Sequence, residues 1–217
     1  MTDAPKPASS KVGFYRPALV RTLETPSVDP ALVERLKGVT GLSSAFSDEL
    51  DPHGYQTVVT AASVAPMRPG DVVIGRALTI RYLPQRLVSG PAGLSHLTAC
   101  ETARPGDVLV ISSPLTSNAS VLGGIAAAAI ADAGVVGVVV QGLVRDVDEI
   151  ETVGLPLWAT GYTPVTGRSR LVAQEVNGPV EIHGVHVVAG DIVVADRSGV
   201  AFVPVELFDQ LAARILG

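Results

Sequence analysis

Residues 119–140 read ASVLGGIAAAAIADAGVVGVVV, and their pattern decides the class of fold. The first part, Ala119–Ala133, is rich in alanine and holds no helix breaker except Gly123 and Gly124 near its start, so it predicts a helix. A glycine ends this helix, and Val135–Val140 is a continuous apolar run, typical of a strand buried on both faces. The stretch therefore predicts a helix packed on a buried strand, the βαβ unit of a layered α/β fold.

One turn signal precedes an apolar run at three places. Its copies are Arg68-Pro69-Gly70-Asp71, Arg104-Pro105-Gly106-Asp107 and Ala189-Gly190-Asp191. A proline sets φ near about −65° and a following glycine accepts positive φ, which together form a type II turn. Each copy predicts a tight turn that leads into a strand, and we expect the three aspartates to bond to the turn backbone rather than to take part in chemistry.

Other segments predict short elements on both sides of this region. Ala31–Lys37 and Ser43–Leu50 are expected to be helices, the second with Ser43 or Ser44 as its N-cap. Short strands are expected at Leu157–Thr160, Val180–His183, Val185–Val188, Ile192–Ala195 and Val200–Val203. The last two are joined by a hairpin turn at residues 196–199, and Glu206–Leu216 is expected to form a terminal helix.

Together these elements predict an α/β architecture, a mixed sheet with a central parallel βαβ unit and antiparallel hairpins around it. Residues 1–15, rich in proline, serine and lysine, are expected to be disordered. Residues 16–217 are expected to form a single domain, because a chain of this length supports one sizeable core.

Composition narrows the class of partner. The 217 residues carry 16 basic and 21 acidic side chains, a net charge of −5, and the basic residues do not cluster. Nucleic-acid binding relies on clustered Lys and Arg, so no nucleic-acid partner is predicted. Cys100 is the single cysteine, which excludes a disulfide framework and a cysteine-based zinc cluster within the chain. We expect it to be a small buried apolar residue.

The pattern of apolar residues also bears on location. Met1–Lys11 lacks the apolar core of a signal peptide. Val121–Val140 is the stretch nearest to membrane-spanning length, but Asp132 interrupts it, and a charge inside a bilayer is costly. The sequence therefore predicts a cytoplasmic protein without a membrane partner.

The two adjacent glycines near the helix start are the first candidate site. They leave the backbone N–H groups of Gly123, Gly124, Ile125 and Ala126 unshielded by side chains. A helix N-terminus has unsatisfied N–H groups and partial positive charge, so it suits a carboxylate or phosphate. The equally good alternative is that the glycines permit close packing against another helix.

Arg145 and Asp146 follow the buried strand and form the second candidate. Ligands collect beyond the carboxyl ends of parallel strands. Asp146 offers hard oxygen ligands for Mg²⁺ or Mn²⁺, and Arg145 offers a planar fork for a carboxylate or enolate oxygen. The residues alone favour the plainer alternative, an Arg–Asp surface pair beside a helix. Because the predicted helix begins at the opposite end of its own segment, a fold-back or a neighbouring subunit must bring Gly123–Ala126 to this pair.

These sequence motifs resemble those of the RraA-like family. The resemblance rests on Gly123–Ala126, the run from Gly134 to Gly142, and Val144–Glu149, in which Gly124 and Arg145 have the spacing usual for the family. The ending from Gly190 to Pro204 is similar too, and the likeness covers roughly residues 42–206. The family includes regulators of ribonuclease E activity and 4-hydroxy-4-methyl-2-oxoglutarate aldolases, which often also decarboxylate oxaloacetate.

The resemblance implies a swivelling β/β/α fold assembled as a trimer or a pair of trimers, with sites between subunits. It implies that the backbone of Gly123–Ala126 binds the pyruvyl carboxylate, that Arg145 binds the 2-oxo group and stabilises the enolate, and that Asp146 binds the metal. This is the logic of a class II aldolase, which needs no Schiff-base lysine. All lysines of this chain lie in its first 37 residues.

One position departs from the family pattern. Gly124 stands where aldolases of the family usually carry Asp or Glu, an acid thought to organise metal-bound water for proton transfer. A general base must then come from elsewhere, with Asp148, Glu149 or an imidazole as the alternatives. Of the imidazoles, His183 and His186 are expected to be a solvated pair rather than a metal site.

We therefore expect a divalent-metal-dependent carbon–carbon lyase acting on a small 2-oxo acid through a pyruvate enolate, of the 4-hydroxy-4-methyl-2-oxoglutarate aldolase or oxaloacetate decarboxylase type. Two alternatives stay open: a non-enzymatic ring-shaped regulator, and a diverged member that uses the same metal and enolate site for other chemistry. The apolar helix and the Val-rich strands carry more hydrophobic surface than a small monomer covers, which predicts a homotrimer or hexamer.

Overall fold

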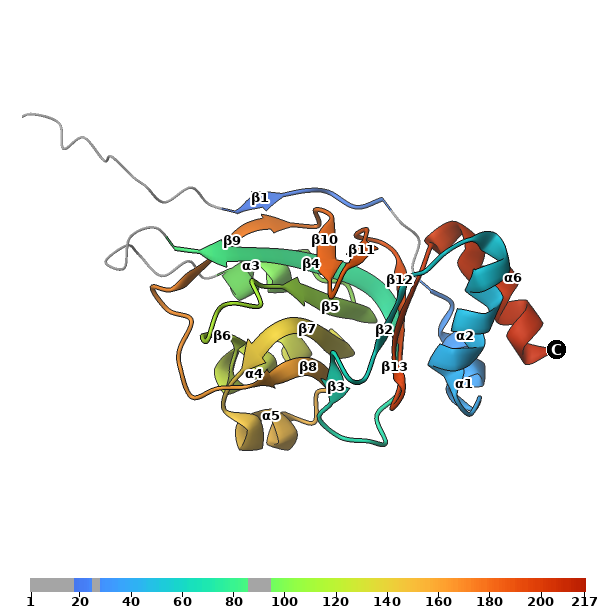
Figure 1. Ribbon diagram of the computed structural model, residues 1–217, viewed down its shortest axis with the longest axis horizontal. Helices are drawn as coiled ribbons and strands as arrows, with labels where there is room; N and C mark the ends of the chain where they lie inside the picture. The colour runs from blue at the N-terminus through green and yellow to red at the C-terminus, as the bar shows by residue number, and fades with distance from the viewer. Residues whose placement is uncertain (1–17, 25–27, 86–94) are drawn as a thin grey trace, which may run out of the picture.

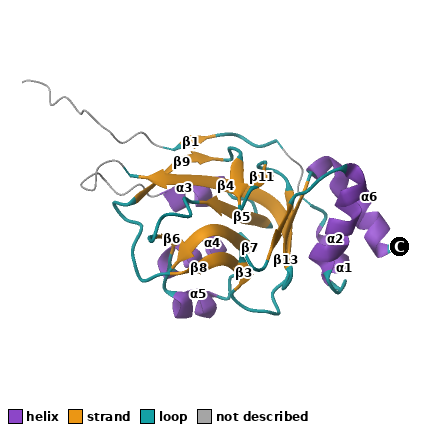
Figure 2. Cartoon of the chain, viewed as in Figure 1, coloured by secondary structure: helices purple, strands orange, loops and turns teal. Residues whose placement is uncertain are grey.

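The fold is built around one large mixed sheet, seen in a computed structural model that describes residues 18–24, 28–85 and 95–217 (Figures 1 and 2). Its main path runs β2-β13-β12-β4-β5-β7-β8-β3, and β10 pairs with β11 in a separate hairpin. The strands are β1 Leu19–Val20, β2 Val58–Thr60, β3 Ala65–Pro66, β4 Val73–Pro84, β5 Asp107–Ser112, β6 Ser120–Leu122, β7 Gly137–Val144, β8 Leu157–Tyr162, β9 Leu171–Val176, β10 Val180–Ile182, β11 Val185–Val187, β12 Ile192–Ala195 and β13 Gly199–Val203. The helices are α1 Pro30–Lys37, α2 Leu42–Leu50, α3 Ser95–Thr102, α4 Gly124–Asp132, α5 Val147–Val153 and α6 Val205–Leu216, with a 3₁₀ turn at Asp51–His53.

The predicted mixed α/β fold is confirmed. Strands β4, β5, β7 and β8 pair in parallel, whereas β12, β13 and β2 continue the sheet antiparallel. Strands β5 and β7 are parallel neighbours, and the chain between them passes through β6 and helix α4. This is the predicted central βαβ unit. The predicted disordered segment, residues 1–15, lies outside the described residues.

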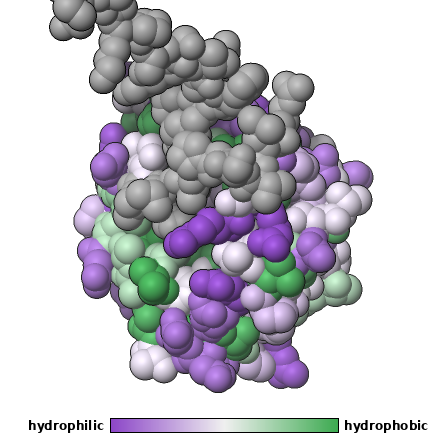
Figure 3. All heavy atoms as spheres, turned by 90° about the vertical axis from the view of Figure 1, so that its left-hand side faces the viewer, coloured by the Kyte–Doolittle hydropathy of each residue, from purple (hydrophilic) through white to green (hydrophobic). Residues whose placement is uncertain are grey.

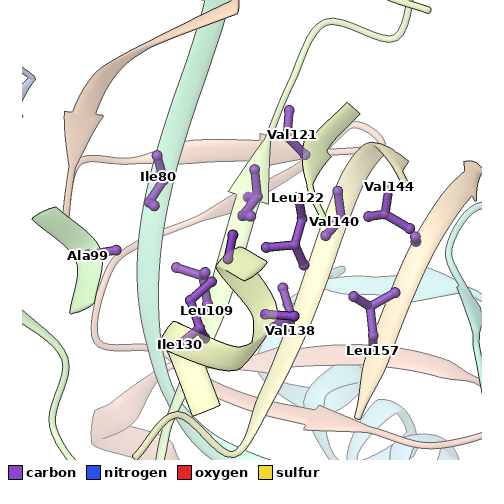
Figure 4. Packing of buried hydrophobic residues seen from close by; sticks show 14 of the residues in the cluster. Ile80, Ala99, Leu109, Val121, Leu122, Ile130, Val138, Val140, Val144 and Leu157 are labelled. Carbon is purple, nitrogen blue, oxygen red and sulfur yellow. The ribbon is translucent and has the colours of Figure 1, made fainter. Parts of the chain in front are cut away.

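Three layers cover the sheet. Helices α3, α4 and α5 pack on one face, where Ile130, Leu109 and Val138 belong to the largest apolar cluster (Figure 4). The β10–β11 hairpin joins a second cluster with Trp158 and Phe202. Helices α1, α2 and α6 pack against β12 and β13 at the far end (Figure 1). Aliphatic side chains therefore supply most of the core, as β-branched residues suit buried pleated surfaces.

The predicted helix over Ala119–Ala133 was wrong at its start. Residues 120–122 form β6, which pairs in parallel with the end of β7, and the helix begins only at Gly124. Gly123 is extended, with φ −146° and ψ 178°, and serves as the N-cap. The helical pattern could not reveal this because Ser120–Leu122 is short and its pairing partner lies more than twenty residues later in the chain.

The recurrent turns agree only in part with the prediction. Gly106 and Gly190 have φ of +92° and +102°, as a type II turn requires, but Gly70 has no positive φ. The Asp191 carboxylate accepts a hydrogen bond from the Val188 N–H at 2.8 Å, and Asp107 accepts one from the Arg104 N–H at 2.9 Å, so both bond to their turns as expected. Burial raises the pKa of Asp191 to about 6.

The expected N-cap of α2 was also wrong. Gly41, in the left-handed conformation with φ 67°, occupies that position. The Ser43 hydroxyl instead donates to Asp196 Oδ1 at 2.7 Å, and the Ser43 N–H donates to Asp196 Oδ2 at 2.9 Å. Asp196 begins the predicted hairpin turn between β12 and β13, which is confirmed by the hydrogen bond from its own N–H to the Gly199 carbonyl at 3.0 Å. One carboxylate therefore ties α2 to that turn.

No helix in the described ranges has both the length and the apolar content needed to cross a membrane.

A buried ion pair joins two central strands. Arg76 on β4 donates to the Asp107 carboxylate at the start of β5 at 2.8 and 2.9 Å, and the two side chains are only 4% and 3% exposed.

We predict that Arg76→Met lowers the free energy of unfolding by about 3–5 kcal/mol, because it leaves a buried carboxylate without its counter-charge. Denaturant titration measures this, with Lys37→Met as control. Lys37 pairs with Glu34 at the surface, so its loss should cost no more than about 1 kcal/mol. Equal stability of the two variants would contradict the prediction.

Candidate active site

Strand β6 brings the two predicted site segments together within one chain. It pairs in parallel with Leu143 and Val144 of β7, and the Arg145 N–H donates to the Leu122 carbonyl at 3.0 Å. The residues that follow the two strands, Gly123 and Arg145, are therefore neighbours. Of the two routes considered for joining the segments, the fold-back within the chain is the one that the structure shows.

A side chain at Gly123 would push against the Arg145–Asp146 pair. A Cβ atom there would lie 2.7 Å from Asp146 Oδ2 and 3.1 Å from Arg145 Nε. The Arg145 Nε and Asp146 Oδ2 atoms are 3.2 Å apart, and Asp146 Oδ2 also accepts the Gly124 N–H at 3.3 Å. The glycine therefore allows the Arg–Asp pair to sit directly on the start of α4.

Asp146 holds an uncommon backbone conformation. Its φ of 57° and ψ of 48° are left-handed, and it is the N-cap of α5, with its carbonyl accepting the N–H groups of Glu149 and Ile150 at 3.1 Å. Aspartate is among the few residues that adopt this conformation at modest cost. The kink turns the chain sharply between β7 and α5, and the side chain caps α4 instead of its own helix.

Glu149 occupies the space beside Gly124. A Cβ atom on Gly124 would lie 2.0 Å from Glu149 Oε2 and 2.6 Å from Glu149 Cβ. Any side chain at position 124 would therefore displace Glu149. An acidic group does lie at this place, but it comes from the first turn of α5, so Glu149 is the best placed of the three alternatives for a general base.

The start of α4 offers free hydrogen-bond donors. The N–H groups of Ile125 and Ala126 donate to no other residue in the described part of the chain. The Ile125 side chain is 86% exposed, so it does not cover them. An anion at this helix start would gain both the donors and the helix dipole.

A cavity of about 280 Å³ is lined by Gly123, Ile125 and Ala126 at the start of α4 and by Arg145 and Asp146. Its walls come from β6, the start of α4, the Arg145–Asp146 corner and the loop Thr166–Ser169. The loop is fixed close to β6, since a Cβ on Gly167 would lie 2.1 Å from the Ser120 carbonyl oxygen, and the Ser120 N–H donates to the Val165 carbonyl at 2.9 Å. It adds Arg168, which the sequence reasoning missed because nothing distinguishes one exposed arginine in a loop from another.

The donor set fits a hard divalent cation that keeps most of its water. Asp146 Oδ1 accepts no hydrogen bond from the described residues, and the side chain is 31% exposed toward the cavity. No cluster of three or more His, Cys, Asp and Glu side chains suited to a metal occurs in the described ranges. Mg²⁺ is commonly held by one or two carboxylates and several waters, so the single carboxylate of Asp146 matches that ion better than zinc.

Neither His183, His186 nor Cys100 lines this cavity. His183 is at the β10–β11 turn, where Nε2 is 2.8 Å from Thr160 Oγ1, and burial lowers the pKa of its imidazole. His186 lines a separate cavity of about 420 Å³ that shares no residue with the candidate site. Cys100 is half-buried and packs against the main core cluster, and burial raises the pKa of its thiol. The side chain of His96, another imidazole of the chain, lies outside the described part of the structure.

Comparison with known proteins identifies the family of this chain. The sequence profile of the RraA-like family, described as Aldolase/RraA, matches residues 43–202. The chain belongs to the RraA-like family. The predicted resemblance is thereby confirmed, and the match includes the whole Gly123–Ala126 and Arg145–Asp146 region.

Individual RraA-like relatives show how far the likeness extends. Protein DlpA of Legionella pneumophila is 28% identical over 93% of this chain, which spans only about a third (32%) of DlpA. A putative 4-hydroxy-4-methyl-2-oxoglutarate aldolase of Halalkalibacterium halodurans is 27% identical, over 75% of this chain and 72% of the relative. The crystal structure of Streptomyces coelicolor RraAS2, an unusual member of the RNase ES inhibitor RraA protein family, superposes with a TM-score of 0.77 and 29% identity, over 89% of this chain and 93% of that one.

The packing around Gly124 leads to a stability prediction. Gly124→Ala should lower the free energy of unfolding by about 1–3 kcal/mol, because the new methyl group overlaps Glu149 and must move α5. Thermal or denaturant unfolding measures the loss. Gly70→Ala is the matched control, since its Cβ would meet no atom within 4 Å and should change stability by less than about 1 kcal/mol. A Gly124→Ala variant as stable as the control would show that Glu149 does not hold this place.

Proposed function

We propose that this protein is a divalent-metal-dependent carbon–carbon lyase that cleaves a small 2-oxo acid to give pyruvate. The observation that carries the proposal is the meeting of Arg145, Asp146 and the open amides of α4 in one cavity. Relatives named as 4-hydroxy-4-methyl-2-oxoglutarate aldolases support the choice of that acid as substrate. We propose oxaloacetate as a second substrate because it also yields pyruvate when its C3–C4 bond breaks.

The start of α4 would bind the substrate carboxylate. The N–H groups of Ile125 and Ala126 are unpaired within the described residues and point to the end of the helix where anions are favoured. Gly123 and Gly124 keep side chains away from that surface. The Arg145 guanidinium, half exposed in the same cavity, would bind the 2-oxo oxygen.

Asp146 is the group that would hold Mg²⁺ or Mn²⁺. Such an ion, when bound, polarises the 2-oxo group as a Lewis acid. Arg145 adds a fixed positive charge at the same oxygen, and that contact strengthens as the oxygen becomes an enolate. Because Asp146 Oδ2 is already bonded to Arg145 and Gly124, the free oxygen Oδ1 is the one available to the ion.

The proposed cleavage balances as a retro-aldol reaction. The C4 hydroxyl loses its proton, the C3–C4 bond breaks, a C4 carbonyl forms, and the electron pair moves into the enolate of pyruvate, which is then protonated at C3. Glu149 is the carboxylate beside the helix start that would accept the hydroxyl proton and return one to C3. With oxaloacetate, the same bond breaks and CO₂ leaves.

A second candidate function is a non-enzymatic, ring-shaped regulator. The observation that favours it is the structural likeness to RraAS2, a member of the RNase ES inhibitor family, combined with the missing acid at Gly124. A diverged enzyme that runs other chemistry from the same metal and enolate site is the third. Both alternatives keep the cavity, but only the enzymes need Arg145 and Asp146 to act on a small acid.

We also propose assembly as a homotrimer or hexamer. Apolar side chains are exposed beside the site, with Ile125 86% and Tyr162 52% exposed. One end of the molecule shows hydrophobic residues interspersed with hydrophilic ones (Figure 3). A second subunit would cover the apolar groups and restrict water at the cavity. Light scattering measures the assembly, and a monomer mass at micromolar concentration would contradict it.

The direct test of the lyase is a cleavage assay with purified protein. We expect pyruvate to form from 4-hydroxy-4-methyl-2-oxoglutarate or oxaloacetate with Mg²⁺ or Mn²⁺, to cease with EDTA and to return when the metal is restored, because one or two carboxylates bind such an ion reversibly. Coupled reduction of pyruvate follows the rate. Full activity in protein shown to be metal-free would refute the metal role, and no pyruvate under any condition would favour the regulator.

Variants of the Arg–Asp pair should fail for different reasons. Asp146→Asn keeps the shape but removes the charge that binds the ion, so excess metal should restore part of the rate. Arg145→Lys keeps the charge but loses the planar fork, so kcat should fall on the order of 10²-fold and extra metal should not restore it. Steady-state kinetics at several metal concentrations separates the two. If both variants keep the wild-type kcat and KM, Arg145 and Asp146 are a surface ion pair with no part in catalysis.

Glu149→Gln belongs to the same series. It keeps the size of the side chain and the fit against Gly124 but removes the proton acceptor, so we expect slower hydrogen–deuterium exchange at C3 of pyruvate as well as slower cleavage. Asp148→Asn is the control one residue earlier. If only the Asp148 variant loses exchange, the base is Asp148.

A further inference from the structure

The candidate site contains one more cation than the proposed chemistry uses. Arg145 is assigned to the 2-oxo oxygen and Asp146 to the metal, whereas Arg168 lines the same cavity from the opposite segment, the loop between β8 and β9. The Arg168 guanidinium makes no hydrogen bond or ion pair with any residue in the described ranges. By contrast, Arg170, two residues on, donates from Nη1 to the Thr166 carbonyl at 3.0 Å.

The backbone that carries Arg168 is fixed rather than loose. Its N–H donates to Thr166 Oγ1 at 3.2 Å, and Ser169 adopts a left-handed φ of 62°. The Gly167 carbonyl accepts the N–H groups of Arg170 and Leu171, both at 2.9 Å. Gly167 itself packs on the β6 backbone, where a Cβ would lie 2.1 Å from the Ser120 carbonyl oxygen. The loop thus holds Arg168 at the cavity wall formed with β6.

The charges in this cavity favour a ligand with two negative groups. Its lining residues carry two arginines, Arg145 and Arg168, and one carboxylate, Asp146. A divalent ion on Asp146 would add two further positive charges. A single carboxylate bound at the start of α4 and beside Arg145 would leave Arg168 unpaired. The volume of about 280 Å³ lies near the lower end of small-molecule sites, so the ligand is a small acid.

We propose that Arg168 binds the second, distal carboxylate of the substrate and thereby selects 2-oxo dicarboxylic acids over 2-oxo monocarboxylic acids. This inference rests on the proposed function, because it places the first carboxylate and the oxo group at α4 and Arg145. A guanidinium matches a carboxylate with two parallel hydrogen bonds, which makes arginine the suitable residue. Arg168 touches neither the breaking bond nor the metal, so it sets specificity and affinity rather than the chemical step.

The same placement separates two reactions. In aldol cleavage the distal carboxylate stays charged and remains bound to Arg168 throughout. In oxaloacetate decarboxylation that carboxylate becomes neutral CO₂, so a contact with Arg168 would be lost on the way to the transition state. Arg168 therefore favours aldol cleavage over decarboxylation.

Calorimetry with ligands that cannot be cleaved tests the inference without relying on turnover. The probes are 2-oxoglutarate and 2-oxopentanoate, which have the same chain length and differ by a methyl group in place of the distal carboxylate. With Mg²⁺ present, we expect Arg168→Ala to lower the affinity for 2-oxoglutarate about 10- to 100-fold, the range expected for the loss of one charged hydrogen bond. Binding of 2-oxopentanoate should change less than about twofold, and Arg168→Lys should restore part of the difference.

Arg170→Ala is the matched control, because it removes the same charge from the same loop without lining the cavity. Its affinity ratio for the two probes should equal that of the wild type. The proposal would be overturned if Arg168→Ala lowered the affinity for both probes equally, or for neither. It would also be overturned if Arg170→Ala changed the affinity ratio as much as Arg168→Ala does.

Cleavage assays distinguish this proposal from the proposed function. If wild-type protein binds 2-oxoglutarate through Arg168 but forms no pyruvate, the lyase fails and the carboxylate site stands. If pyruvate forms and Arg168→Ala keeps the wild-type KM for 4-hydroxy-4-methyl-2-oxoglutarate, the lyase stands and the carboxylate site fails.

Discussion

The pairing of β6 with the last residues of β7 is the constraint on which the site depends. Three residues of extended chain, Ser120–Leu122, pair beside Leu143 and Val144, and the Leu122 carbonyl accepts the Arg145 N–H. This places the end of one strand against the end of another, so the first residues of α4 and α5 meet. Without this pairing, the donors of one helix and the Arg–Asp corner of the other would belong to separate surfaces.

Close approach at this junction determines which residues are tolerated. Gly123 leaves space for the Arg145–Asp146 pair, and Gly124 leaves space for Glu149. Position 124 cannot hold an acidic side chain while Glu149 lies there, because their atoms would overlap. Gly124, where the resemblance led us to expect an acid, and Glu149 of α5 are therefore linked, because the acid beside the helix start comes from a different element.

The site also gathers positive charge around the backbone N–H donors at the start of α4. Helix α4 presents its N-terminus, Arg145 its guanidinium and Arg168 a second one, while Asp146 is the single carboxylate that lines the cavity. Such a wall suits the proposed ligands, a small polyanion and, at Asp146, a hard cation. The rest of the sheet holds these groups in place, since β5 at its centre is buried along its whole length and the Arg76–Asp107 pair joins β4 to β5 inside it.

The sequence by itself was enough to predict the βαβ unit, the hairpin of β12 and β13, the terminal helix and the family. Each of these depends on residues that are close together in the chain, either as a periodic pattern or as a sequence motif. It also named Arg145, Asp146 and the two glycines as site candidates, and the structure brings these residues together. Only the tertiary structure decided that residues 120–122 form a strand, that Gly41 rather than a serine caps α2, and that Glu149 and Arg168 lie near the site. The physical reason is the same in each case: a three-residue strand, a left-handed cap and an exposed arginine acquire their roles from atoms far away in the chain, and no local periodicity records such contacts.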